Sequence, residues 1–173
     1  MANKLQYALL IIAGAICLAS LLTFTDAAAD PHFQVVGTVY CDTCRAKFVT
    51  RVSERMPGAK VRLECYNNTD GKLTYSADGE TDSNGVYNID AVGEHQDEFC
   101  GVKPVKSSKD DCTEIIEDGW AKDFTRVTLT TKNGIADMAR NVNPILYLKD
   151  KPIAACPEVF KELRYIPGEN QHP

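Results

Sequence analysis

The sequence is poor in the residues and motifs that carry most enzyme chemistry. It holds three histidines and one tryptophan in 173 residues. The patterns G-x-S-x-G, G-x-x-x-x-G-K-[ST] and H-E-x-x-H do not occur. The chain therefore lacks the common signatures of α/β-hydrolases, P-loop nucleotide-binding proteins and zinc peptidases. We predict that it is not an enzyme, with no catalytic residue, no cofactor and no metal ion.

Positive charge and long apolar segments are also scarce. The net charge is −5 at pH 7, and no run of lysine and arginine forms a basic stripe. Because nucleic-acid binding depends on neutralising phosphates, the sequence argues against DNA or RNA as a partner. Beyond Phe24, no segment is long and apolar enough to span a membrane.

The first 29 residues have the layout of a secretory signal peptide. Met1–Tyr7 carries Lys4 and no acidic residue, Ala8–Phe24 is apolar and uncharged, and an alanine triplet ends at Ala29. A transmembrane anchor is the alternative, because the run is nearly long enough to span. The alanines favour cleavage after Ala29. Residues 1–29 would then be a signal peptide, and residues 30–173 one secreted domain without a membrane segment.

The cysteine content indicates disulfide bonds. Cys17 would leave with the signal peptide, and six cysteines would remain in the secreted domain: Cys41, Cys44, Cys65, Cys100, Cys112 and Cys156. An even number of cysteines in a small secreted chain is typical of a disulfide framework. Their spacing alone does not choose among the possible pairings.

Apolar residues mostly follow a two-residue period, which is typical of β-strands. The strands predicted in this way are Phe33–Tyr40, Ala59–Tyr66, Lys72–Ala77, Val86–Val92, Glu98–Val105, Phe124–Thr131 and Pro144–Leu148. We predict an all-β domain, a disulfide-stapled antiparallel β-sandwich or barrel of about seven strands. Arg45–Met56 is ambiguous because its apolar residues fall at helical spacing, Ile135–Val142 is irregular or a short helical turn, and Pro157 is placed to begin a short helix.

Two turns follow from composition. Asn67–Gly71 (NNTDG) predicts a hairpin tip, and Asp82–Gly85 (DSNG) predicts a second tight turn. Asn67-Asn68-Thr69 is also the one N-x-[ST] sequon of the chain. In a secreted protein this pattern predicts a glycan on Asn67, exposed at the hairpin tip.

The stretch GTVYCDTCR, residues 37–45, contains a Cys-x-x-Cys with three interpretations. A strand followed by this motif and by a helix would resemble the redox centre of a thioredoxin-like oxidoreductase. Cys41 and Cys44 also have zinc-ligand spacing, but no second pair of ligands follows. The third interpretation, which we favour, bonds Cys41 and Cys44 to separate distant cysteines. Four further cysteines and a secretory route favour stable disulfides.

The same stretch resembles the signature of the Ole e I-like family of pollen allergens and extensin-related plant proteins. The matching pattern is Gly-x-Val-Tyr-Cys-Asp, a small residue, and Cys-Arg, which residues 37–45 follow throughout. Cys156–Pro157–Glu158 resembles a further feature of that family. The resemblance extends over residues 30–173. It implies a compact β-barrel or sandwich with the pairs Cys41–Cys112, Cys44–Cys156 and Cys65–Cys100.

The resemblance also implies a function. It suggests a non-enzymatic, secreted glycoprotein that acts by binding in the extracellular space or cell wall, in pollen development or pollen-tube growth. A receptor-kinase ectodomain or a cell-wall component would be its partner, and allergenicity is expected. Two other sites in the sequence carry residues that could bind a ligand. Glu94–Glu98 offers carboxylates and His95 to a cation, but a solvated loop is expected there, and Trp120 is expected in the core rather than as a sugar-stacking platform.

Overall fold

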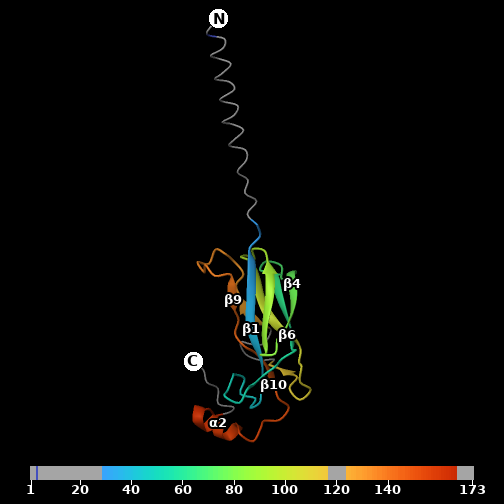
Figure 1. Ribbon diagram of the computed structural model, residues 1–173, viewed down its shortest axis with the longest axis vertical. Coiled ribbons are helices and arrows are strands. Elements are labelled where there is room, and N and C mark those ends of the chain that lie inside the picture. The colour runs from blue at the N-terminus through green and yellow to red at the C-terminus, as the bar shows by residue number, and fades with distance from the viewer. Residues whose placement is uncertain (1–2, 4–28, 117–123, 167–173) are drawn as a thin grey trace.

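The computed structural model describes residue 3 and residues 29–116 and 124–166. Over these residues the chain folds into two β-sheets and one short helix near the carboxyl end (Figure 1). The strands are β1 His32–Asp42, β2 Glu54–Arg55, β3 Lys60–Asn67, β4 Leu73–Glu80, β5 Val86–Val92, β6 Glu98–Lys106, β7 Glu114–Ile115, β8 Thr125–Val127, β9 Ala139–Asn141 and β10 Ile145–Leu148. The helix α2 spans Cys156–Leu163. The all-β, disulfide-bonded class predicted from the sequence is confirmed.

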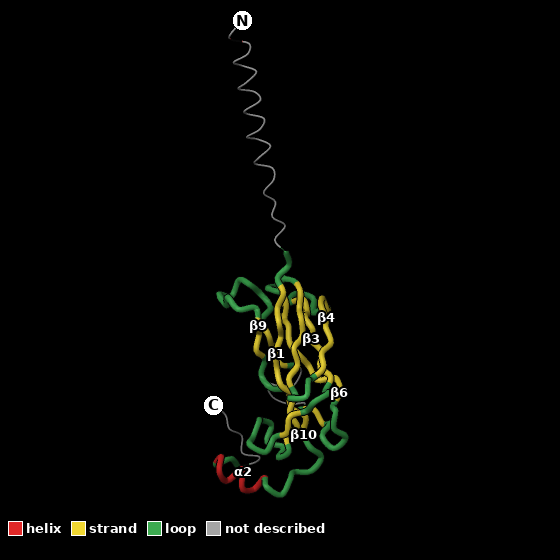
Figure 2. Tube along the Cα trace, in the orientation of Figure 1, coloured by secondary structure: helices red, strands yellow, loops and turns green. Residues whose placement is uncertain are grey.

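Strand β1 is the spine of the first sheet. Its first half pairs antiparallel with β5, from His32 opposite Val92 to Thr38 opposite Val86, and parallel with β9. Its second half pairs antiparallel with β2 and parallel with β10, which in turn pairs with β7. One long strand therefore joins two groups of partners, and Figure 2 shows it running through both halves of the molecule.

The second sheet has the order β4-β3-β6-β8 and is antiparallel throughout. The alternation that predicted β3 is reproduced, because Val61, Leu63 and Cys65 are buried. These side chains pack with those of β1 and β5, including Phe33 and Tyr87, in one apolar core. Burial of this apolar surface between the two sheets is the main force that holds the sandwich together.

Both predicted turns are present. The chain reverses after Asn67, so that β3 and β4 form a hairpin. In the second turn the carboxylate of Asp82 accepts hydrogen bonds from the backbone N–H groups of Asn84 and Val86, at 2.8 and 2.9 Å. Gly85 has φ +72°, and a Cβ there would lie 2.9 Å from the backbone nitrogen of Met56. Glycine is required at this position by conformation and by space.

Three sequence predictions need correction. Arg45–Met56 is not helical, and its regular structure is limited to β2. Within Phe124–Thr131 only Thr125–Val127 forms a strand. Ile135–Val142 contains β9, which pairs parallel with β1 and was not predicted. The first sheet is therefore mixed, whereas the sequence suggested antiparallel pairing throughout.

The predicted signal peptide lies outside the described residues except for Asn3 and Ala29. Its cleavage after Ala29 stays a prediction. In the described part of the chain, no helix has the length and apolar character needed to cross a membrane.

Candidate functional site

The signature segment, Gly37–Arg45, covers the second half of β1 and the turn that follows it. Its two cysteines are not bonded to each other. The three disulfides of the structure join Cys41 to Cys112, Cys44 to Cys156, and Cys65 to Cys100. These are the pairs that the family resemblance implies.

The two cysteines of the segment serve different parts of the molecule. Cys41 belongs to the main core and reaches Cys112, which precedes β7. Cys44 belongs to a second, small cluster that it forms with Ala46 and Cys156, against partly buried Phe48, Val52, Ile153 and Phe160. Since Cys156 begins α2, this disulfide attaches the helix to the end of β1. The Cys-x-x-Cys thus anchors two distant segments.

Asp42 shapes the turn that separates the two cysteines. Its side chain is fully buried, and its two oxygens accept hydrogen bonds from the backbone N–H groups of Cys44 at 3.1 Å and Lys47 at 2.7 Å. Burial raises the pKa of Asp42, and hydrogen bonds from the backbone of Lys47 and Cys44 partly offset this effect. The carboxylate thus pairs the N–H groups of Cys44 and Lys47 within the turn. Arg45 and Lys47 also take positive φ values, which a right-handed helix does not allow. The carboxylate therefore favours a turn at this point.

Arg45 closes the segment with a bidentate ion pair. Its guanidinium donates to both carboxylate oxygens of Glu114, at 2.7 and 2.8 Å, and to the carbonyl oxygen of Lys149 at 2.9 Å. The pairing raises the pKa of Arg45 and lowers that of Glu114. The arginine thereby links the turn to β7 and to the end of β10.

The remaining signature residues are also structural. A Cβ on Gly37 would lie 2.2 Å from the hydroxyl of Tyr87, so only glycine fits there. Val39 is fully buried, Tyr40 lies 5.7 Å from the guanidinium carbon of Arg55, and the hydroxyl of Thr43 donates to the carbonyl of Val52. These residues of the motif stabilise the fold through packing and hydrogen bonds.

The thioredoxin-like alternative is wrong on this geometry. A redox dithiol requires Cys41 and Cys44 to bond each other and a helix to follow them. Here each sulfur is bonded to a distant, buried partner, and no helix begins at Arg45. The same bonds leave neither sulfur as a thiolate for the zinc site that their spacing also allowed.

Beside the signature segment lies an open surface depression. Its lining residues are Arg45, Lys47, Thr113, Glu114, Ile115, Ile116 and Leu148. A smaller pocket, which shares Lys47, Ile115 and Ile116 with this depression, holds only about 30 Å³. Pockets that enclose a small-molecule ligand are typically about ten times larger or more. The geometry near the signature suits contact with a large partner better than enclosure of a small one.

Asn67 ends β3 at the hairpin tip, as predicted. Its side-chain carbonyl accepts hydrogen bonds from the backbone N–H groups of Thr69 and Asp70, at 2.8 and 3.2 Å. Asn68 and Thr69 are exposed. Asn67 itself is half-buried, and its glycosylation stays a prediction.

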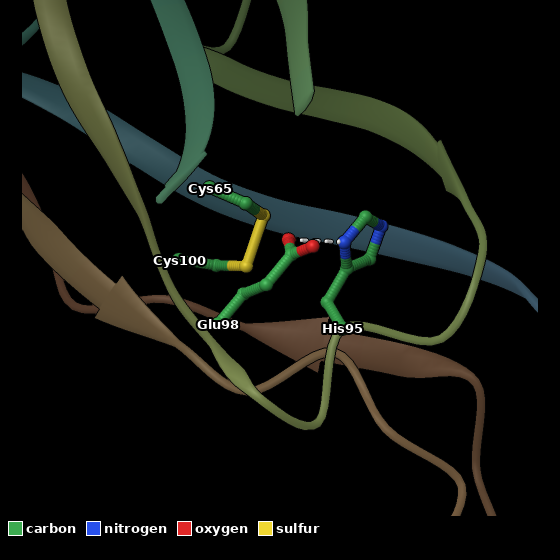
Figure 3. A group of neighbouring side chains, drawn as sticks. All are labelled: Cys65, His95, Glu98 and Cys100. Atoms are coloured by element: carbon green, nitrogen blue, oxygen red, sulfur yellow. Dashed lines mark hydrogen bonds and ion pairs between the residues drawn. A yellow bond between two sulfur atoms is a disulfide. The ribbon is translucent and has the colours of Figure 1, made fainter. Parts of the chain in front are cut away.

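The acidic segment Glu94–Glu98 differs from its expectation as a solvated loop. Gln96 and Asp97 are exposed, but His95 is buried and lies 2.7 Å from the carboxylate of Glu98. Figure 3 shows the pair beside the Cys65–Cys100 disulfide. The sequence signal that could have found this pair is the spacing of three residues between histidine and glutamate. Trp120 lies outside the described residues.

Known proteins resemble this chain in sequence and in fold. A family model described as "Pollen protein Ole e 1 like" matches residues 31–164. Pollen allergen Cro s 1 of Crocus sativus is 44% identical over 156 residues, which cover 90% of this chain and 92% of that protein. Anther-specific protein LAT52 of Solanum lycopersicum is 35% identical over 160 residues, covering 92% of this chain and 97% of that protein.

A solved structure supports the same relationship. The crystal structure of the major plantain pollen allergen Pla l 1 matches with a TM-score of 0.63 and 38% sequence identity, covering 72% of this chain and 99% of that chain. The family model and the relatives match most of the chain, and the solved structure matches its fold. The chain belongs to the family of pollen proteins like Ole e 1.

Proposed function

We propose that this chain is a secreted, non-enzymatic glycoprotein that acts by binding in the extracellular space or cell wall. Its partner is a receptor-kinase ectodomain or a cell-wall component, and its setting is pollen development or pollen-tube growth. It is also proposed to be allergenic, since relatives are named pollen allergens.

Secretion is supported by the chemistry of the cysteines. Three disulfides persist in oxidising compartments and are rare in the cytosol. The signal-like residues 1–29 and the sequon at the β3–β4 hairpin tip fit the same route. The pollen setting is supported by relatives that are named as pollen and anther proteins.

The observation that carries the proposal is the bonding of Cys41 and Cys44 to two different buried cysteines. The Cys-x-x-Cys, which could have been a redox centre, instead links two distant segments of the chain to β1. The neighbouring Asp42 and Arg45 are occupied in the same way, by the turn and by Glu114. The side chains of the signature segment therefore stabilise the fold. A rigid surface supported in this way suits a binding protein.

The test has a catalytic arm and a binding arm. Residues 30–173 are produced through a secretory host and assayed for reduction of insulin disulfides. The same material is passed over immobilised receptor-kinase ectodomains from pollen tubes and over an array of cell-wall polysaccharides. We expect saturable binding to one of these and no turnover of insulin. Turnover of insulin disulfides, or no binding to either class, would contradict the proposal.

Secretion and glycosylation have their own test. The full chain is expressed in plant cells, and the protein of the medium is analysed by mass spectrometry. We expect a protein that starts at Asp30 and loses mass on treatment with a peptide N-glycosidase. The matched variant Asn67→Gln is expected to be secreted without that extra mass. Retention of residues 1–29 in the membrane fraction would contradict secretion.

A further inference from the structure

Four potential metal ligands converge where β3 and β6 pair. They are the sulfurs of Cys65 and Cys100, Nδ1 of His95 and the carboxylate of Glu98, and all lie within 4.8 Å of one another (Figure 3). The two sulfurs form a disulfide in the structure. Among residues 29–116 and 124–166, no other group of three or more such side chains comes this close.

The fold itself brings the four groups together. Cys65 and Cys100 are directly opposite in the antiparallel β3–β6 pair. Glu98 lies two residues before Cys100 on the same strand, so its side chain leaves the strand on the same face. The turn before β6 is held by hydrogen bonds from the backbone of His95 to Leu129 and of Glu98 to His95. This turn places the imidazole beside the disulfide.

The imidazole is oriented as a metal-binding histidine is. Its Nε2 faces the carbonyl oxygen of Val92 at 3.2 Å, and its Nδ1 faces the sulfurs and Glu98. A carbonyl oxygen only accepts, so Nε2–H donates to Val92; the Glu98 carboxylate, 2.7 Å from Nδ1, is also an acceptor, so an ion would have to replace the proton of that contact. Histidines that bind metals commonly donate their second N–H to a carbonyl, which fixes the ring and leaves the other nitrogen for the ion. The ring of Tyr75, 5.0 Å away between centroids, further holds the imidazole in place.

We propose that the dithiol form of Cys65 and Cys100 binds one zinc-class divalent ion together with His95 and Glu98. Two thiolates, one imidazole nitrogen and one carboxylate oxygen make a four-ligand set that suits tetrahedral coordination. All four ligand atoms already lie within 4.8 Å of one another, and the two sulfurs, bonded to each other in the disulfide, must separate on reduction to reach positions around one ion. This site is independent of the binding function proposed above.

The disulfide and the metal site are alternative states. An external dithiol of the thioredoxin or dithiothreitol class gives two electrons and two protons to the Cys65–Cys100 bond, which breaks into two thiols, and the reductant becomes a disulfide. The ion then displaces a proton from each thiol and takes the place of any proton on Nδ1. In the disulfide state neither sulfur is a thiolate, so the site does not exist.

The first experiment uses the secreted domain with cobalt(II) as a spectroscopic probe for zinc. Dithiothreitol is added until thiol counting gives two thiols, which peptide mapping assigns to Cys65 and Cys100. We expect one equivalent of cobalt bound, with thiolate charge-transfer absorption, in this form and none in the disulfide form. The matched control Cys65→Ser/Cys100→Ser, reduced in the same way, is expected to bind none. Equal cobalt binding by this control would overturn the proposal.

A second variant tests the site without any reductant. Cys100→Ser leaves a free Cys65 thiol beside His95 and Glu98, with the other two disulfides intact. We expect zinc to slow alkylation of Cys65 in the folded variant at least about tenfold, and this protection to be lost in Cys100→Ser/His95→Gln. Near-ultraviolet circular dichroism checks that both variants are folded. Unchanged alkylation in the presence of zinc, or equal protection in the double variant, would overturn the proposal.

Discussion

The two ends of the sandwich are held together by different forces. The end that contains β3, β4, β5 and the start of β1 is held by long paired strands and by a core of nineteen buried residues among those described. The other end, which we call the stapled end, comprises residues 42–55 and 149–165, and its separate cluster is built on buried Cys44, Ala46 and Cys156. Figure 1 shows this end below β1, with α2 at its far side.

The two ends differ in how much native structure depends on a disulfide. Cys65–Cys100 joins strands that already pair over eight positions. Cys44–Cys156 joins segments 112 residues apart whose shared core is too small to hold them. In the chain-entropy model these two bonds stabilise the fold by comparable amounts, about 4 to 5 kcal/mol. What differs is the native structure that survives their removal.

The largest effect is expected from Cys44→Ala/Cys156→Ala. Loss of the bond should lower the free energy of unfolding by roughly 4 to 5 kcal/mol and release α2 from the signature segment. Urea unfolding measures the energy, and limited proteolysis should cut the chain before Cys156. In the matched variant Cys65→Ala/Cys100→Ala, β3 and β6 should stay protected from the protease. Equal protection of α2 in both variants would contradict the contrast between the two ends.

The paired-strand end is tested by Gly37→Ala. The added Cβ would collide with the hydroxyl of Tyr87, so we expect a loss of about 1 to 3 kcal/mol in urea unfolding. Tyr87→Phe removes that hydroxyl, which is buried without a hydrogen-bond partner among the described residues, but keeps the ring carbon Cζ that would lie 2.5 Å from the new Cβ, so it should restore little of the loss. Tyr87→Leu removes the outer ring atoms and should restore more, and a double-mutant cycle of Gly37→Ala with Tyr87→Leu whose effects are strictly additive would contradict the clash.

Asp42→Asn tests the turn of the stapled end. The amide keeps the size of the carboxylate but offers one acceptor oxygen instead of two, so the N–H group of Cys44 or Lys47 loses its partner. We expect a cost of roughly 1 to 3 kcal/mol, measured by urea unfolding. Hydrogen exchange should locate the loss at residues 43–47. Exchange that increases only in β3 and β5 would place the effect in the wrong region.

The smallest effect is expected from Glu114→Gln. Arg45 lowers the pKa of Glu114 in the folded protein, so the ion pair stabilises the fold above the ordinary glutamate pKa. This contribution is lost as the pH falls through the lowered value. Wild type should therefore lose slightly more stability than the variant on acidification, measured by urea midpoints. Glu158→Gln, whose carboxylate lies 3.9 Å from Arg51, is the control, because it removes an exposed carboxylate and keeps the Arg45–Glu114 pair.

Sequence reasoning succeeded where periodicity reflects burial. Val61, Leu63 and Cys65 alternate because one face of β3 meets the core, and the tight turn at Asp82–Gly85 follows from local chemistry. The segment after Cys44 was misjudged as possibly helical, because its apolar spacing carries no trace of the contacts that Asp42 makes with its backbone. The spacing of apolar residues does not reveal that the buried carboxylate of Asp42 accepts hydrogen bonds from this segment.

Long-range contacts account for the other differences. Strand β9 has no apolar period, and only its parallel pairing with β1 makes it a strand. The sequence places His95 in a solvated loop. In the structure its backbone N–H donates to the carbonyl of Leu129, and its side chain is buried. The disulfide pairs could not be chosen from spacing either, and they followed from the family resemblance alone.

The central claim is that the Cys-x-x-Cys is a structural anchor, and disulfide mapping tests it most directly. The secreted domain is digested without reduction, and the linked peptides are identified by mass spectrometry. The account predicts Cys41–Cys112, Cys44–Cys156 and Cys65–Cys100, with no free thiol. A bond between Cys41 and Cys44 that a mild dithiol reduces would contradict it.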